Sequence, residues 1–260
     1  MSQHVYQHYR VEERAFVDQV LDWIMQVEQQ YAPKLTDFLD PRQLAIAKEL
    51  LGNRSDISLY SHGGYQGAER QRLLFAPDYM VPETDDYGIV CFEIVYPVKF
   101  VTLEHSNVLG AAMNVGLDRV KFGDIVSNPP RYQLIVAEEV ASFVQRELTS
   151  VGKATIKLKE KPPHEVIIPA EEGQPQQLIV ASLRLDAVLA QGFRLSRAKA
   201  SALIQAGKVK VNFQIIDAGS FEVQPSDVLS LRGYGRLFIS SIEGQTRRAK
   251  FRLSTFVKKS

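Results

Sequence analysis

Residues 184–212 read RLDAVLAQGFRLSRAKASALIQAGKVKVN, and this stretch carries the signals of two short helices followed by a strand. Apolar residues in its first part recur at three- and four-residue spacing, which places them on one face of a helix. Gly192 ends the predicted helix, because glycine is common just past a helix C-terminus. The apolar face of this helix consists of Leu185, Val188 and Leu189.

The second helix has clear boundaries in the sequence. Ser196 can cap the first turn through its hydroxyl, which predicts a helix over residues 197–206. Gly207 ends that helix, and the alternating residues 209–212 predict a strand directly after it. Two helices followed by a small strand system form a compact unit, and this favours a separate C-terminal domain.

Basic residues in this stretch occupy positions that do not favour the helices themselves. Arg197 and Lys199 lie in the first turn of the second helix, where a positive charge costs about 0.3–1 kcal/mol at an exposed site. A bound phosphate would reverse that cost, because free backbone N–H groups and cations would then converge on an anion. Further cations flank the two helices: Arg184, Arg194, Lys208 and Lys210.

The charge of the whole chain is unevenly distributed along it. Residues 181–260 hold 14 Lys and Arg against 5 Asp and Glu, a net charge of +9. Residues 1–180 hold 17 against 25, a net charge of −8, and the two parts give the overall +1. A basic domain joined to an acidic body is expected where one end of a protein meets a polyanion. A chance excess of surface cations is the alternative.

Length and composition restrict the class of protein. The 260 residues allow two or three domains of roughly 100–150 residues each. The sequence has no apolar run of about 18 residues and therefore predicts no membrane insertion. The polar residues 1–14 predict neither a secretory signal nor a transit peptide. The single cysteine, Cys91, excludes an internal disulfide and a cysteine zinc site, so we expect a reducing, cytoplasmic location and no cofactor.

Residues 1–52 are predicted to form a helical N-terminal region. Pro33 interrupts a first helix, since proline can neither donate a backbone hydrogen bond nor continue the helix. A second helix has Asp40 as its cap and Pro41 at its first position, and Gly52 ends it. The first helix has one apolar stripe, formed by Phe16, Val20, Trp23, Ile24, Val27 and Tyr31.

Residues 53–165 are predicted to form an α+β middle domain. After short strands at 57–60 and 72–76, the predicted order is strand, helix, strand, strand, helix, strand, which is that of a ferredoxin-like or RRM-like sheet. These elements cover residues 88–96, 105–115, 124–127, 132–137, 138–148 and 154–159. The middle domain lacks the basic-aromatic signature of an RNA-reading RRM, so we expect four of its aromatic residues to be core: Tyr60, Tyr65, Phe92 and Phe100.

A linker is predicted at residues 166–177, where proline, glycine and polar residues are dense. The C-terminal domain then covers residues 178–260, with further strands near 228–231, 237–242 and 250–256. Its end is a basic, flexible-looking tail that we expect to attract phosphates without specificity. The cations of this tail are Arg247, Arg248, Lys250, Arg252, Lys258 and Lys259.

The C-terminal motifs resemble an S4 domain, an RNA-binding module named after a small-subunit ribosomal protein and shared with bacterial pseudouridine synthases and tyrosyl-tRNA synthetases. The match covers residues 178–242 with the spacings intact. The motifs that carry it are Arg184-Leu185-Asp186-x-x-Leu189, Ser196-Arg197, Ile204-x-x-Gly207-x-Val209-x-Val211-Asn212, Asp227-x-Leu229, Leu231-Arg232 and Gly235-Arg236.

The rest of the chain resembles the YlmH family of bacterial S4-domain proteins, whose cyanobacterial and plastid relatives are named photosystem II S4 domain proteins. This similarity spans residues 37–257. One departure is Ser106, where many members have a basic residue, and it weakens any RNA contact there. The motifs are Gly63-Gly64-Tyr65-x-x-Ala68-Glu69-Arg70, Leu103-x-His105, Leu109-Gly110-Ala111-x-Met113-x-x-Gly116-Leu117-x-Arg119 and Gly123-Asp124-Ile125.

The resemblance implies an RRM-like middle domain followed by an S4 domain, and binding to ribosomal RNA and tRNA on the large ribosomal subunit. Some members of the family rescue stalled nascent chains. Within the S4 motif we expect phosphate contacts that read backbone shape more than base edges. Arg184 could instead pair with Asp186 or Asp227, and Lys210 could be a solvated strand residue. The expected contacts are Arg184, Arg197, Lys199, Arg194, Ser196, Lys208, Lys210, Asn212, Arg232 and Arg236.

Two other function classes remain as alternatives. One is an RNA-modifying enzyme of the pseudouridine synthase type, but its catalytic domain usually follows the S4 module, and here only a short tail does. His105 has no second histidine or carboxylate pair at metal-ligand spacing. We therefore expect no catalysis, no metal and no small-molecule substrate. The other alternative is a factor for photosystem II assembly or expression that acts through RNA binding.

Overall fold

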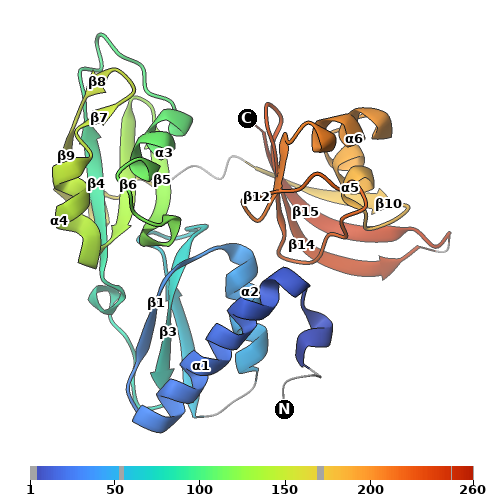
Figure 1. Ribbon diagram of the computed structural model, residues 1–260, viewed down its shortest axis with the longest axis horizontal. Helices are drawn as coiled ribbons and strands as arrows, with labels where there is room; N and C mark the ends of the chain where they lie inside the picture. Colours follow the sequence, from blue (N-terminus) through green and yellow to red (C-terminus); the bar gives the residue numbers. More distant parts are fainter. Residues whose placement is uncertain (1–4, 53–55, 169–172, 247, 260) are drawn as a thin grey trace. The chain divides into compact units, whose positions relative to one another are not determined.

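The computed structural model describes residues 5–52, 56–168, 173–246 and 248–259 (Figure 1). The chain forms two compact units, residues 1–169 and residues 170–260. Each unit has its own core.

The first unit begins with two helices packed on a three-stranded antiparallel sheet of order β1-β3-β2. The predicted cap of α2 is confirmed, because the Asp40 carboxylate accepts a hydrogen bond from the backbone N–H of Gln43 at 2.9 Å. The elements are 3-10 helices Val5–His8 and Val11–Glu13, α1 Arg14–Gln30, β1 Lys34–Leu39, α2 Pro41–Leu51, β2 Ile57–His62 and β3 Gln71–Pro77.

The N-terminal region differs from the expectation in two respects. It contains a strand, β1, in which Thr36 and Phe38 are buried at alternate positions directly after the interrupting proline. Strands β2 and β3, expected in the middle domain, pair with each other and β3 pairs with β1. The boundary expected at residue 52 therefore lies beyond Pro77, and residues 53–55 are outside the described part. Strand pairing between distant segments was not readable from local patterns.

The middle of the chain forms the predicted ferredoxin-like sheet. Its strand order is β5-β6-β4-β9 and every neighbouring pair is antiparallel, which is the arrangement of a split βαβ sheet. The elements are the 3-10 helix Thr84–Tyr87, β4 Ile89–Val95, α3 His105–Met113, the 3-10 helix Arg119–Lys121, β5 Phe122–Asn128, β6 Arg131–Ala137, α4 Glu138–Glu147, β7 Ser150–Val151, β8 Ala154–Thr155, β9 Lys157–Lys161 and the 3-10 helix Pro163–Glu165.

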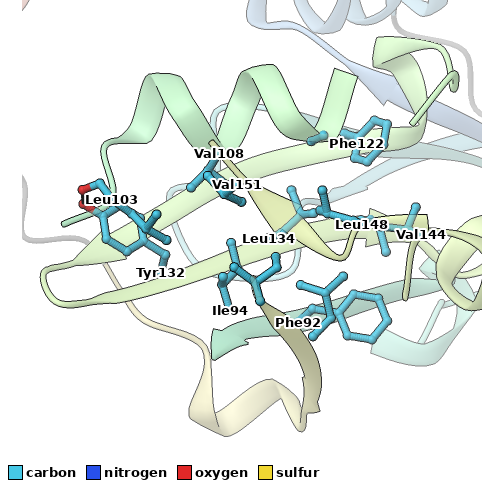
Figure 2. Close-up of a cluster of buried hydrophobic side chains, with 14 of the residues drawn as sticks. Phe92, Ile94, Leu103, Val108, Phe122, Tyr132, Leu134, Val144, Leu148 and Val151 are labelled. Atoms are coloured by element: carbon cyan, nitrogen blue, oxygen red, sulfur yellow. Dashed lines mark hydrogen bonds between the residues drawn. The ribbon is translucent and has the colours of Figure 1, made fainter. Parts of the chain in front are cut away.

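One face of this sheet makes the largest core of the first unit. Figure 2 shows Phe92 and Leu134 from the sheet beside Val144 of α4, and Val108 of α3 beside Val151. The core role expected for Phe92 is confirmed, since its side chain is 1% exposed. Phe100 was expected in the core as well, but it is 87% exposed because it lies in the loop between β4 and α3.

The opposite face of the sheet is covered as well. Cys91, Ile135 and Ala137 pack against Phe38 of β1 and against partly buried side chains that include Tyr65 and Val166. This is the face through which RRM sheets stack on bases. In the first unit, the N-terminal strands occupy part of that face.

A partly buried carboxylate joins the N-terminal and middle parts. Asp124 accepts hydrogen bonds from the Tyr65 hydroxyl at 2.8 Å and from the backbone N–H groups of Glu69 and Arg70 at 2.7 and 3.2 Å. The guanidinium of Arg70, whose residue is 4% exposed, donates to the carbonyl oxygens of Phe38 and Phe122. The motifs at residues 63–70 and 123–125 thus serve the fold.

The second unit is a six-stranded antiparallel sheet of order β10-β15-β14-β13-β11-β12 with two helices against one face (Figure 1). The predicted pair of helices is confirmed. The elements are β10 Gln174–Val180, α5 Leu185–Gly192, α6 Arg197–Gln205, β11 Val209–Val211, β12 Gln214–Ile215, β13 Val228–Leu231, β14 Gly235–Gln245 and β15 Phe251–Lys259.

The strand predicted near residues 250–256 is confirmed as β15, which extends to Lys259. The expected flexible tail is therefore wrong for Arg252, Lys258 and Lys259, whereas Arg248 and Lys250 lie in the connection before the strand. β15 pairs with β10 on one side and with β14 on the other, and its buried residues Leu253, Thr255 and Val257 alternate with residues that are partly or fully exposed. Arg247, also assigned to the tail, lies outside the described residues.

The expected linker is shorter than predicted. Gln174 already begins β10, and Ile167 is 8% exposed and donates its backbone N–H to Gln133 at 2.7 Å. Residues 169–172 lie outside the described part.

Two glycines of the first unit give a matched test of the packing between the ferredoxin-like sheet and β1. A Cβ at Gly123 would lie 2.9 Å from both Ile135 Cγ2 and Phe38 Cε1, so Gly123→Ala should lower the free energy of unfolding by about 1–3 kcal/mol. A Cβ at Gly110, within α3, would meet nothing within 4 Å, so Gly110→Ala should raise it by about 0.5–1 kcal/mol. Urea denaturation of the full chain measures both, and equal effects would contradict the packing described.

Candidate nucleic-acid interface

Arg184 and Arg197 converge on one buried carboxylate. The Arg184 Nη2 lies 2.9 Å from Asp186 Oδ2, and the Arg197 Nη2 lies 3.1 Å from Asp186 Oδ1. The side chain of Asp186 is 7% exposed, whereas those of Arg184 and Arg197 are 43% and 56% exposed. One face of each guanidinium is therefore fixed by the fold while the rest remains open to solvent.

The backbone holds this carboxylate in place at the start of α5. The Leu185 N–H donates to the carbonyl oxygen of Phe221 at 2.8 Å, and the Asp186 N–H donates to that of Gly219 at 3.2 Å. Carbonyl oxygens of the loop before β13 thus accept hydrogen bonds from N–H groups at the start of α5, which have no acceptor within the helix.

The electrostatics of the cluster favour the charged states of Asp186 and Arg184. Burial alone would raise the pKa of Asp186, but hydrogen bonds from Arg184 and Arg197 outweigh it and hold that pKa below its ordinary value of 3.8. The hydrogen bond with Asp186 raises the pKa of Arg184 in turn.

Lys199 lies in the first turn of α6, two residues after Arg197. The Ser196 hydroxyl caps α6 by accepting a hydrogen bond from the Lys199 N–H at 3.2 Å, as the sequence predicted. The Lys199 ammonium lies 5.6 Å from the centre of the Tyr234 ring, and Tyr234 packs edge-on against Phe193 at 6.1 Å. Arg194 is exposed in the connection between α5 and α6, where its φ is +56°.

Asn212 has a role inside the fold that the sequence did not predict. Its Nδ2 donates to Asp227 Oδ1 at 2.8 Å, and its Oδ1 accepts from the Val228 N–H at 2.9 Å. Asp227 is fully buried, and Asn212 has a φ of +47° at the turn between β11 and β12. This geometry gives no support to an RNA contact by the Asn212 amide.

The other four predicted contacts lie away from the arginine cluster. Lys208 and Arg232 are neighbours at the end of the β11–β13 pair, where the Arg232 N–H donates to the Lys208 carbonyl oxygen at 3.0 Å. Lys210 and Arg236 alternate along their strands with Val211 and Leu237, which face the helices. Side chains alternate across a strand, so Lys210 and Arg236 point to the opposite face.

The structure therefore separates the predicted contacts near the helices from Lys210 and Arg236, which lie on the opposite face of the sheet. The helix surface, as we call it, comprises Arg184, Arg194, Arg197, Lys199 and Tyr234. Sequence reasoning treated Asp186 only as an alternative partner of Arg184 and did not find Tyr234. The signal available for Asp186 was a lone acidic residue between two arginines in the S4 motif. Nothing in the sequence near Tyr234 indicated its role.

The described residues include no group of three or more His, Cys, Asp or Glu side chains that could hold a metal ion. His105 is exposed at the start of α3. No helix in the described part of the chain is long and apolar enough to cross a membrane.

The helix pair and the sheet that follows define the C-terminal unit as an S4 domain, and the S4 domain family model matches residues 183–229. Two further models match the first unit: "YlmH, N-terminal" at residues 12–80 and "Putative RNA-binding domain in YlmH" at residues 82–165. The boundary between these two models lies between β3, the last strand of the N-terminal sheet, and β4, the first strand of the ferredoxin-like sheet.

The chain belongs to the YlmH family of S4-domain proteins. It is 44% identical over 250 residues to "Ribosome-associated protein quality control protein P2" of Bacillus subtilis, covering 96% of this chain and 97% of that protein. The solved structure "Cell division protein ylmH from Streptococcus pneumoniae" is 36% identical with a TM-score of 0.54, and the match covers 63% of this chain and 99% of that one.

Asp186→Asn tests the arginine anchor. The loss of the charge weakens the hydrogen bonds from both arginines, so the free energy of unfolding should fall by about 1–2 kcal/mol at neutral pH. Because the folded-state pKa of Asp186 lies below its ordinary value of 3.8, the stabilisation is fully present above 3.8 and is lost as the pH falls below 3.8 through the lower folded-state pKa. Urea denaturation across pH should show the variant and wild type converging in acid.

The exposed Asp217→Asn is the matched control in the same unit. A difference between Asp186→Asn and wild type that persists unchanged in acid would contradict the ion-pair account.

Proposed function

We propose that this chain binds structured RNA, namely ribosomal RNA and tRNA on the large ribosomal subunit, through the helix surface of its S4 domain. The observation that carries the proposal is the pair of exposed guanidiniums fixed on the buried Asp186 carboxylate. Cations held in place before binding lose less side-chain entropy when a phosphate docks.

The mode of recognition follows from the same residues. Arginine and lysine contacts to phosphate position a protein on RNA without reading its sequence, and structured RNA is recognised largely by shape. The Tyr234 ring beside Lys199 adds a flat surface on which an unpaired base can stack. Binding is therefore dominated by electrostatics and falls steeply with salt.

The cellular role proposed here is ribosome-associated quality control of translation in the cytoplasm. Its support is the Bacillus subtilis relative, whose name describes a ribosome-associated quality control protein. The chain acts in this proposal by binding and catalyses no reaction, since neither that name nor the family descriptions include one. A role in photosystem II expression stays a prediction from the sequence.

The double substitution Arg184→Ala/Arg197→Ala tests the helix surface. Losing two phosphate contacts should reduce the slope of log K against log salt by about 1.4–1.8 and release the protein from large subunits. Sucrose-gradient sedimentation of tagged full-length protein, with a salt series on purified large subunits, measures both effects.

The control is Lys34→Ala/Lys48→Ala, which removes two charges from the N-terminal region and should sediment like wild type. Wild-type protein that stays at the top of the gradient at low salt would contradict ribosome binding. Equal behaviour of the arginine variant and the control would place the RNA contact elsewhere.

A further inference from the structure

Three cations form one row across the face of the C-terminal sheet that the helices leave open. Strand register pairs Lys210 with Ser230, Ser230 with Arg236, and Arg236 with Lys258. Side chains that are directly paired across an antiparallel sheet lie on the same face. The row therefore crosses β11, β13, β14 and β15 in order, with Ile215 of β12 beyond Lys210 at its edge.

This row lies opposite the helix surface. The adjacent row of Val211, Leu229, Leu237 and Val257 belongs to the core against α5 and α6. Successive residues of a strand point to opposite faces, so the cation row is directed away from the helices. A ligand bound at Arg184 and Arg197 would have to extend around an edge of the sheet to reach the cation row.

The cation row is unfavourable for the sheet itself. Arg236 and Lys258 are like charges directly opposite one another, an arrangement that destabilises an antiparallel pair. Neighbouring strands lie about 4.8 Å apart, so all three cations fall within roughly 15 Å, where salt screens repulsion incompletely. The six strands contain five Lys or Arg and one acidic residue, Glu243, which accepts from Gln177 and Ser254.

Aromatic rings accompany the cations on the same face. The row next to the cations contains Phe238 and Phe256, paired in register with ring centres 6.3 Å apart and an interplanar angle of 64°. The Arg236 guanidinium lies 5.9 Å from the centre of the Phe213 ring. Further along β15, Arg252 is exposed and lies opposite Ile179, which is 47% exposed.

We propose that this sheet face, defined by Lys210, Arg236, Lys258, Phe238 and Phe256, is a second RNA-binding surface. It takes a single-stranded or looped RNA segment, with phosphates on the cations and unpaired bases against the aromatic rings. The S4 domain then holds two RNA segments at once, one on each side of its sheet. This inference rests on the proposed RNA-binding function.

Charge and ring chemistry favour RNA over a protein partner. An acidic peptide would satisfy the cations, but it would not use the adjoining aromatic pair as a stacking surface. Grooves that combine backbone-tracking cations with aromatic rings are the common design for single-stranded nucleic acid.

The test uses the full-length protein with two probes, protein-free large-subunit rRNA and intact large subunits, each titrated with salt. Lys210→Ala/Lys258→Ala should reduce the salt slope on both probes by about 1.4–1.8. Its melting temperature should equal or exceed that of wild type, because the substitution removes like-charge repulsion. The matched controls are Lys34→Ala/Lys48→Ala and, for the other surface, Arg184→Ala/Arg197→Ala.

The outcomes separate the inference from the proposed function. Loss of binding in both the sheet-face and helix-surface variants, with stability kept, supports two surfaces. A sheet-face variant that binds both probes like wild type overturns the second surface and leaves the first. A variant that binds free rRNA normally but loses intact subunits shows a protein contact and overturns the RNA assignment. Wild type that binds neither probe overturns both proposals, and a lowered melting temperature contradicts the repulsion argument.

Discussion

The buried carboxylate of Asp186 is the interaction on which the candidate RNA surface depends. Its negative charge would be costly in the protein interior without partners, and Arg184 and Arg197 supply them from the starts of two different helices. The Arg197 contact joins α6 to α5, and both contacts hold cations at the surface. In the proposed function, a single side chain thus serves both the stability of the domain and the binding of RNA.

Buried or partly buried carboxylates recur as the means by which this chain joins separate segments. Asp227 orders the turn at Asn212, and Asp124 connects the N-terminal strands to the ferredoxin-like sheet. Among the described residues, no buried side-chain nitrogen or oxygen lacks a hydrogen-bond partner. Polar groups that looked like candidate contacts in the sequence were in several cases needed by the fold, because burial makes an unpaired polar group expensive.

The sequence predicted those features that depend on local patterns. The capped helices α2 and α6 and the element order of the middle domain were readable from caps, glycines and periodicity. Strand partners were not readable, since β1 pairs with a segment more than 30 residues later, and β15, although predicted near residues 250–256, pairs with β10 more than 70 residues earlier. For the site, residue type was enough to predict the cations. Only the strand register of the folded sheet shows that Lys210 and Arg236 lie on the face away from Arg184 and Arg197.

The most direct test of the account is ultraviolet crosslinking of the full-length protein bound to large ribosomal subunits, with the crosslinked peptides mapped by mass spectrometry. The account predicts nucleotide adducts in the second unit, on peptides that contain Phe193 or Tyr234 beside the helix surface. Adducts confined to the first unit, with none in residues 173–259, would contradict it and transfer the RNA contact to the middle domain.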